Sequence, residues 1–450
     1  MMLRSRTVAY RLGGLMTTTA SSGLRSLDEL DIHTISLYEQ FGYPWEAWDR
    51  LREEAPCYWY DREGIAPFWA ITRHEDVKSI GSNSAAFING GGRLRIKSLD
   101  IDARYAAARE KKLEMYEWDP AVPEDMVFLD NPAHHAMRQL TVRHFTPARC
   151  RDMASEMAEN AANITGEFAA RLESGETSDL IHDYAVALPL MTIASMMGVE
   201  RDDWADIHRW TDAMFDNESM RFALPGEERR VMRRRVHAEF HGYVAGLIER
   251  KRNEPADDLS TVLVHADIDG RKLTEQELHG YLRLLINAGN ETTRNALSRG
   301  VLALIDNPDQ VDRLTDDPDR FVDSAVDEIV RWTTPVIEFA RTAIRDVELH
   351  GQTIRAGDHV ALWYGAANRD PRVFDDPYSF DIGRSPNDHL AFGHGGHFCL
   401  GANLAKWELR AALRALAESE VLHRLERAEE PEWLTDLHVG AYRTALVRYK

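Results

Sequence analysis

The sequence has 450 residues, of which 44% are hydrophobic, and its 54 Lys and Arg against 74 Asp and Glu give a formal net charge of −20. That composition excludes a collagen-like or wholly disordered chain, and the acidic balance argues against nucleic-acid binding. No run of apolar residues approaches the ~18 that a membrane-spanning helix needs. The three cysteines, Cys57, Cys150 and Cys399, are too few for a disulfide framework and favour a reducing compartment.

The N-terminal part divides into a tail and the start of a folded unit. Residues 1–26 are expected to be disordered, with several Arg and a Ser/Thr-rich run but no Asp or Glu, a composition that transit peptides share. From Leu27 the pattern becomes globular and leads into a helix that ends at Glu54. Two strands are expected next, at 57–60 and 68–72, joined by a polar turn.

Helices dominate the middle of the chain, from about 133 to 330. Apolar residues recur every three or four positions through 153–172 and 185–197, which predicts amphipathic helices. Asp and Pro mark the ends of several helices.

After residue 340 the residue pattern no longer predicts mainly helices. Strands are expected at 342–349 and 360–363, followed by a loop rich in Pro, Asp and Gly and by a last long helix to about Glu420. No internal repeat or low-complexity linker divides the chain. We therefore expect one large unit, 27–450, that is mainly α with a small β portion.

The sharpest local feature is the segment 392–401, Phe-Gly-His-Gly-Gly-His-Phe-Cys-Leu-Gly. Its glycines allow unusual backbone dihedrals and close approach to another group. A cysteine just before a helix start lies where the helix dipole favours thiolate, so Cys399 could bind a metal. Two other interpretations are a tight turn around a buried cysteine and a zinc site with His394 and His397, although no second ligand pair is visible.

This segment resembles the cysteine-ligand loop of cytochrome P450 at Phe392, Gly395, His397, Cys399 and Gly401. The resemblance extends over 27–450 and implies the P450 fold, a triangular prism with haem between an oxygen-activation helix and the cysteine loop. It also implies that Cys399 is the axial thiolate of the iron of haem b, packed against Phe392.

A second segment, 288–293, lies inside an apolar helix expected from about Leu278 to Ile305 and resembles the family's oxygen-activation motif. Glycine in mid-helix costs ~1 kcal/mol, so close approach of a cofactor to Gly289 is one explanation. The other is a helix-crossing notch with Thr292 hydrogen-bonded to its own backbone. The resemblance implies that Thr292 donates a hydrogen bond to dioxygen or its water. Glu291, where many relatives have Asp, would connect that site to a proton supply.

Two further groups match the family by position. Glu328 and Arg331, at i and i+3 on a helix, resemble its Glu-x-x-Arg motif, and Arg384 falls where the family places a third member of this structural network. The family's haem-propionate contacts correspond to His134, Arg138, Arg341 and His397. Taken singly, each of these four reads more simply as a solvated residue.

The resemblance also indicates which residues line the substrate pocket, and most of them are apolar, which favours a hydrophobic small molecule of steroid or terpenoid type. They are Phe87, Leu285, Ala288, Val336, Ile337, Phe339, His438 and Val439. The charged segment 90–127 is expected to be a mobile cover over this pocket.

These features together imply a haem-thiolate monooxygenase that inserts one atom of O₂ into a C–H bond, located in a bacterial cytoplasm. No flavin or iron–sulfur motif is evident, so electrons must come from a separate ferredoxin and ferredoxin reductase. A basic patch for such a partner is expected from Lys406, Arg410, Arg143, Arg149 and Arg151. The alternatives are a peroxide-driven haem peroxygenase, which would not need Thr292 and Glu291, and a non-catalytic haem-thiolate ligand-binding protein, which would leave them unexplained.

Overall fold

The computed structural model describes residues 26–90, 93–215, 220–434 and 437–450. The tail expected at 1–26 therefore lies, except for Ser26, outside the described residues. The α-helices are α1 (Ile35–Phe41), α2 (Trp45–Glu54), α3 (His74–Ser82), α4 (Leu99–Met115), α5 (Ala133–Gln139), α6 (Pro147–Asp152), α7 (Ala154–Glu173), α8 (Ala187–Met196), α9 (Trp204–Phe215), α10 (Arg229–Asn253), α11 (Leu259–His265), α12 (Glu275–Asp306), α13 (Pro308–Asp316), α14 (Pro318–Thr333), α15 (Tyr364–Ala367), α16 (Ala402–Ala417) and α17 (Val421–Arg424). The strands are β1 (Cys57–Tyr60), β2 (Phe68–Ile71), β3 (Phe87–Ile88), β4 (Ser178–Asp179), β5 (Asp267–Ile268), β6 (Arg271–Lys272), β7 (Glu338–Ala343), β8 (Val347–Leu349), β9 (Gln352–Ile354), β10 (His359–Trp363), β11 (Leu425–Arg427), β12 (Glu432–Trp433), β13 (Tyr442–Thr444) and β14 (Leu446–Tyr449).

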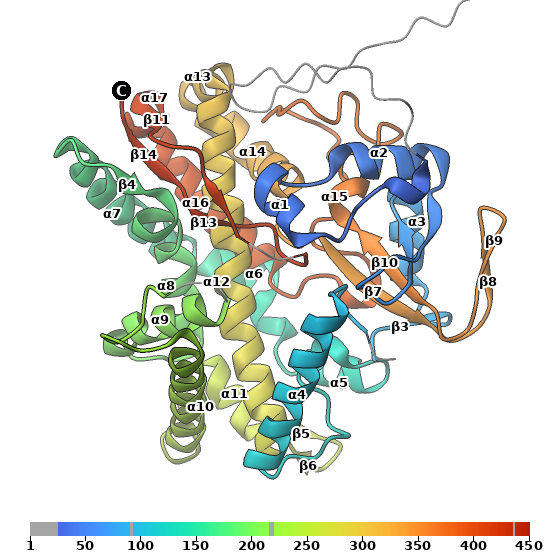
Figure 1. Cartoon of the computed structure of the whole chain (residues 1–450). Coiled ribbons are helices and arrows are strands. Elements are labelled where there is room, and N and C mark those ends of the chain that lie inside the picture. Colours follow the sequence, from blue (N-terminus) through green and yellow to red (C-terminus); the bar gives the residue numbers. More distant parts are fainter. Residues whose placement is uncertain (1–25, 91–92, 216–219, 435–436) are drawn as a thin grey trace, which may run out of the picture.

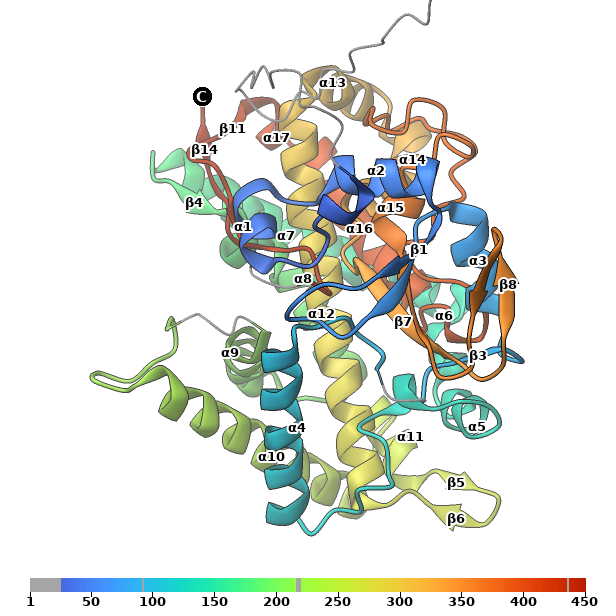
Figure 2. The ribbon, with the colours of Figure 1, turned by 45° about the vertical axis from the view of Figure 1, so that its right-hand side comes forward.

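Helix α12 has 32 residues and runs through the middle of the molecule (Figure 1). A capping box fixes its start, because Thr274 Oγ1 accepts from Glu277 N at 3.2 Å while the Glu277 carboxylate accepts from Thr274 N at 2.8 Å. Helices α7 to α10 lie on one side of α12, and the main sheet with α2 and α3 lies on the other (Figures 1 and 2). The predicted apolar helix at 278–305 is confirmed within slightly wider bounds.

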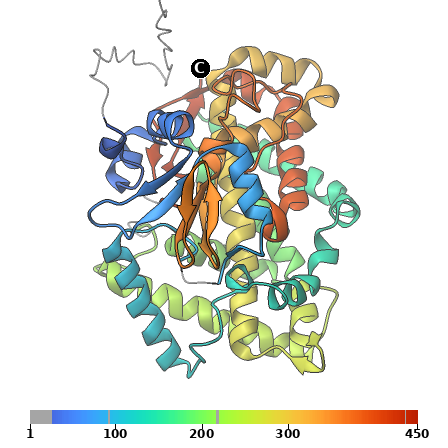
Figure 3. The same cartoon turned by 90° about the vertical axis from the view of Figure 1, so that its right-hand side faces the viewer.

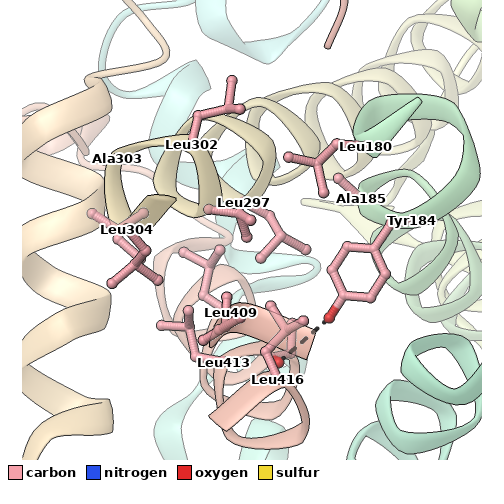
Figure 4. Close-up of a cluster of buried hydrophobic side chains, with 14 of the residues drawn as sticks. Leu180, Tyr184, Ala185, Leu297, Leu302, Ala303, Leu304, Leu409, Leu413 and Leu416 are labelled. Carbon is pink, nitrogen blue, oxygen red and sulfur yellow. Dashed lines mark hydrogen bonds between the residues drawn. The ribbon is translucent and has the colours of Figure 1, made fainter. Parts of the chain in front are cut away.

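A large hydrophobic cluster fixes α12 against α16. Leu297 and Leu304 of α12 meet Leu409, Leu413 and Leu416 of α16 (Figure 4). Full burial of a leucine side chain is worth about 1.5–3 kcal/mol, so this packing sets the relation between the helix of the 288–293 motif and the helix that follows the cysteine loop.

Helix α8 departs from the expectation for 185–197. The helix itself is confirmed as α8, which follows a π-helix at Leu180–Ala185, but α8 is buried on most sides and is not amphipathic. It packs between α7, α9, α12 and α16, so it has no wide polar face toward solvent.

The main sheet has five strands in the order β1-β2-β10-β7-β3, with β2 parallel to β10 and the other pairs antiparallel. The pairing of β1 with β2 confirms the two strands predicted near the N-terminus. The single strand predicted at 342–349 is wrong: β7 ends at Ala343 and Ile344 is exposed. The chain then leaves the sheet, because β8 pairs with β9 in a separate hairpin that projects from the molecule (Figures 1 and 3).

Most of the predicted cover, the described part of 90–127, consists of α4 and the loop after it. Helix α4 has no buried residue and stands beside the lower half of α12 in Figures 1 and 2. Its C-terminal end is attached by Lys112, whose Nζ lies 4.8 Å from the ring centre of Trp118, and by Gln276 of α12, which exchanges hydrogen bonds with the Asp119 backbone at 2.9 and 3.0 Å. None of the helices in the described part of the chain is long and apolar enough to cross a membrane.

Candidate active site

The cysteine loop places Cys399 three residues before α16. Cys399 N donates to the Phe392 carbonyl at 2.9 Å, which closes the loop on itself. Burial raises the pKa of the Cys399 thiol, while the backbone N–H groups of Gly401 and Ala402 and the charge of Arg138 lower it. The expectation of a thiolate favoured by the helix start is thus half right: the N–H groups are present, but burial outweighs them until a metal binds the sulfur.

The other two cysteines differ from Cys399 in both exposure and chemistry. Cys57 and Cys150 are buried, and burial raises the pKa of their thiols to about 12 and about 11. Cys399 is enclosed by protein atoms deeply enough for burial to raise its pKa, yet its surface is exposed. The Cys399 thiol therefore faces an opening inside the protein.

Four basic side chains from three separate segments meet beside this loop. The rings of His134 and His397 are stacked with centroids 3.9 Å apart. Burial, together with His134, Arg341 and Arg138, lowers the pKa of His397 to about 3, so its imidazole is neutral. His134, Arg341 and His397 also line a cavity of about 40 Å³. The set is therefore suited to bind carboxylate groups next to Cys399.

The middle of α12 shows a second exposed position. Ala288 is exposed although most residues of α12 are buried. Thr292, one turn later, donates its hydroxyl to the Ala288 carbonyl at 2.9 Å, as the simpler interpretation of the sequence had it. Gly289 faces a different neighbour, since a Cβ there would lie 3.0 Å from Ile193 of α8. The glycine thus allows close packing of α8 on α12, as the helix-crossing interpretation expects, and its contact with a cofactor stays a prediction.

Glu291 belongs to a buried charge network that crosses from α12 to α9. Its carboxylate accepts from Arg294 at 2.6 Å, and Arg294 also donates to Asp212 at 2.9 Å. Burial raises the pKa of Asp212, but Arg294 and His182 lower it more, so its net shift is downward. Asp212, Arg294 and His182 line a cavity of about 190 Å³ on this side of α12. The network links Glu291 to that cavity.

Glu328 and Arg331 form the predicted pair, and both are fully buried. Two hydrogen bonds of 2.7 Å join the guanidinium to the carboxylate, and Arg384 Nε lies 3.2 Å from Glu328 Oε2. Arg331 also donates to three carbonyls of the loop that leads to the cysteine segment, those of Asn368, Pro377 and Ser379. The network therefore fastens this loop to α14.

Comparison with known proteins decides the family. The family model described as "Cytochrome P450" matches residues 96–419. The chain belongs to the cytochrome P450 family. This P450 is similar to two proteins of Mycobacterium tuberculosis. One is a methyl-branched lipid omega-hydroxylase, 34% identical over 413 residues that cover 90% of each chain. The other is a steroid C26-monooxygenase, 36% identical over 378 residues that cover 82% of this chain and 81% of the relative.

Solved structures confirm the expected fold. The structure of a cytochrome P450 of Mycobacterium marinum in complex with pseudoionone covers 95% of this chain and 100% of its own, with 31% identity and a TM-score of 0.81. Members of this family are haem-dependent oxidoreductases whose iron is held by a cysteine thiolate.

The residues of this P450 fit such a haem. Ala288 is exposed on a largely buried helix and Cys399 is exposed at the end of its loop, so both have surface that a bound haem could cover. The neighbouring histidines and arginines match two propionates. Among the described residues no group of three His, Cys, Asp or Glu side chains is arranged to hold a metal ion by itself, which speaks against the zinc alternative.

The predicted pocket residues occupy different surroundings. Val336 and Val439 form an isolated β-bridge, and the rings of Phe339 and His438 make an edge contact with centroids 4.6 Å apart. Ile337 is instead fully buried in a core cluster with residues of the main sheet, and its place in the pocket stays a prediction. Leu285 and Phe87 are buried in two further clusters.

The basic patch is smaller than predicted. Lys406 and Arg410 of α16 each pair with a carboxylate of α14, Lys406 with Asp327 at 2.7 Å and Arg410 with Asp323. Their charges are therefore compensated. The three arginines before α7 are exposed on the segment that contacts α16; they are Arg143, Arg149 and Arg151.

Sequence reasoning missed two groups of this region. Arg294 was detectable, because it follows Glu291 at i+3 on a helix. Glu408 of α16 carried no sequence signal. Its carboxyl group is buried between α8, α12 and α16, and neither oxygen has a hydrogen-bond partner among the described residues. Burial raises its pKa to about 8, although the hydroxyls of Thr293 and Thr192 act in the opposite direction.

We expect Glu408 to make stability depend on pH. An unfolded glutamate ionises above about pH 4.5, whereas the folded one keeps its proton up to about pH 8, so stability falls as pH rises between these values. Glu408→Gln should remove this dependence. Relative to the wild type it should gain on the order of 4 kcal/mol between pH 5 and pH 8 in urea unfolding. Parallel pH profiles of the two proteins would contradict the assignment.

Proposed function

We propose that this P450 inserts one oxygen atom of O₂ into a C–H bond of a hydrophobic small molecule of steroid or terpenoid type, with electrons from a separate ferredoxin and its reductase. Cys399 supplies the thiolate to haem b, and His134, Arg138, Arg341 and His397 hold the propionates. The observation that carries the proposal is the meeting of these four side chains beside the Cys399 thiol. When bound, haem supplies the activation of dioxygen, and the chain supplies orientation, protons and exclusion of water.

The substrate class is supported by the pocket and by the relatives. Val336, Phe339 and Val439 are apolar, and apolar walls favour a hydrophobic ligand. The relatives named above act on a methyl-branched lipid and on a steroid, and the neighbouring structure holds pseudoionone.

Thr292 and Glu291 act as the proton relay of this proposal. Rotation about the Cα–Cβ bond of Thr292 takes its hydroxyl from the Ala288 carbonyl to the exposed side of α12, where it can donate to dioxygen or a water. Glu291 carries a proton only after its carboxylate leaves Arg294. The cavity lined by Asp212 and Arg294 gives this step a route to solvent.

Replacing Thr292 by alanine is expected to uncouple NAD(P)H consumption from hydroxylation of the substrate. The hydroxyl that holds the proton donor is lost, so electrons are consumed while hydroxylated product falls about tenfold and hydrogen peroxide appears. The measurement compares NAD(P)H consumed, product formed and peroxide released. Thr315→Ala is the matched control, because Thr315 on α13 makes the same bond to a carbonyl four residues back, at 3.0 Å. Equal coupling in both variants would contradict the relay.

Electron delivery separates the proposed monooxygenase from its alternatives. The exposed Arg143, Arg149 and Arg151 beside α16 support docking of an acidic ferredoxin. Hydroxylation is measured with a ferredoxin and its reductase, with hydrogen peroxide alone, and with neither. We expect turnover in the first arm. Turnover with peroxide alone would indicate a peroxygenase, and binding without turnover in any arm would indicate a ligand-binding protein.

A further inference from the structure

A short basic segment, 93–97, runs along the edge of β7. Ala340 N donates to the Leu94 carbonyl at 2.7 Å, and Ile96 N donates to Glu338 Oε1 at 3.1 Å. Burial alternates along the segment: Leu94 and Ile96 are buried, and the three basic residues around them are half-buried. Arg93, Arg95 and Lys97 are therefore presented away from the core that holds the two apolar side chains.

Two of these cations already have partners. Arg93 pairs with Asp102 and also donates to the Ala66 carbonyl at 3.3 Å. Lys97 Nζ lies 3.7 Å from the ring centre of Tyr105. Both side chains are thus accounted for by groups of the chain itself.

Arg95 differs from its neighbours. Its Nε is buried without a hydrogen-bond partner, and its guanidinium makes no hydrogen bond or ion pair with the described residues. A buried donor left unpaired costs the desolvation of that group, so such donors are rare in proteins unless a ligand or water meets them. The Arg95 guanidinium is therefore available to bind a group from outside the chain.

The electrostatic neighbours of Arg95 place it between two walls of the predicted pocket. Burial keeps the pKa of His438 well below its usual range, and the charges of Arg95 and Lys97 lower it further. Burial raises the pKa of Asp125, and Arg95 together with Arg283 opposes that rise. His438 touches Phe339, on the wall formed by β7 and the C-terminal loop.

The second wall is α12 with the loop that covers its first half. A Cβ at Gly280 would overlap the Glu124 carbonyl, so the loop at 124–125 lies directly on α12. Asp125 lies 3.7 Å from Arg283 of α12 and accepts from Val127 N at 2.9 Å. Both carboxylates near Arg95 therefore have other partners. Asp125 pairs with Arg283, and Glu338 accepts a hydrogen bond from Ile96 N and lies 3.2 Å from His438 Nδ1.

We propose that Arg95 binds the carboxylate of the substrate, and that the substrates of this enzyme are hydrophobic carboxylic acids. This inference rests on the proposed function, because it assumes that the apolar body of the ligand lies in the pocket. A guanidinium offers two parallel N–H donors that match a carboxylate, and the pair is strong where water is excluded. A neutral alcohol of the same skeleton gives this half-buried cation no charged partner and binds more weakly.

The test measures dissociation constants of acid and alcohol pairs on the haem-loaded enzyme, by the shift of the Soret band and by calorimetry. The pairs are dodecanoic acid with dodecan-1-ol, geranic acid with geraniol, and lithocholic acid with its C24 alcohol. For the best-fitting skeleton we expect the wild type to bind the acid about tenfold or more tightly than the alcohol. Arg95→Gln should lower this ratio by about tenfold.

The matched control is Arg93→Gln, which removes a neighbouring cation that is already paired with Asp102 and should leave the ratio as it is. If Arg95→Gln fails to fold, Arg95→Lys takes its place and should keep only part of the preference. A wild type that binds alcohols as tightly as acids, or an Arg95 variant with an unchanged ratio, overturns the proposal while the monooxygenase assignment stands. Absence of a thiolate-type haem spectrum would instead overturn the proposed function.

Discussion

Glu328→Gln is expected to destabilise this P450 by about 3–5 kcal/mol and to release haem more readily. The substitution leaves Arg331 fully buried and without its carboxylate, and Arg384 loses the same partner. Removing one member of a buried ion pair costs this much because the remaining charge stays in a medium of low dielectric constant. Urea unfolding of the purified holoenzyme, followed by circular dichroism and by haem absorbance, measures both effects.

The same helix provides a control for this prediction. Asp323 of α14 pairs with Arg410, and its side chain is mostly exposed. Asp323→Asn should change stability by less than about 1 kcal/mol, because exposed ion pairs contribute little. If Glu328→Gln were as stable as Asp323→Asn, the buried network would not be what fastens the loop before Cys399 to α14.

Replacement of Cys399 by serine should abolish hydroxylation, with a loss of at least about a hundredfold, while the fold is kept. A serine hydroxyl does not ionise at neutral pH and gives the iron no thiolate ligand. Serine is close to cysteine in size, so the packing at position 399 changes little and far-ultraviolet circular dichroism should match the wild type. Product formation and the iron content of the purified protein are the two measurements.

Cys150→Ala is the control for Cys399→Ser. Cys150 is a buried thiol of α6 whose pKa is raised by burial to about 11, and it is expected to act only through packing. The variant should keep its haem and its activity with a small loss of stability. A Cys399→Ser protein that hydroxylates as well as Cys150→Ala would mean that another group holds the iron.

The motifs that could be predicted from the sequence are local ones. The cysteine loop carries its glycines and its cysteine within ten residues, and Glu328 and Arg331 share one helix face. Arg294 belongs to the same class, since its partner Glu291 is three residues away. Helix periodicity also predicts α12, because a 32-residue apolar helix leaves a long regular pattern.

The features that could not be predicted depend on contacts between distant segments. The role of Gly289 is set by Ile193 of α8, and nothing near Gly289 in the sequence announces that neighbour. Asp212 reaches Arg294 only because α9 packs across α12. The strand at 342–349 breaks since β8 finds its partner in β9, and hydrophobic patterning cannot choose between the two pairings.

The two rows of charges that form the ion pairs between α14 and α16 are each visible in the sequence. Asp319, Asp323 and Asp327 repeat every four residues on α14, and Lys406, Arg410 and Arg414 repeat every four on α16. The structure joins them one to one. Each pattern reads as a solvated face on its own, and only the packing of the two helices turns it into compensated charge.

The central claim is that the sulfur of Cys399 binds the haem iron, and the absorption spectrum of the reduced protein under carbon monoxide tests it most directly. We expect the red-shifted Soret band that a thiolate ligand gives to the ferrous carbonyl form. A protein without a Soret band, or a native carbonyl form that absorbs like a histidine-bound haem, would contradict it.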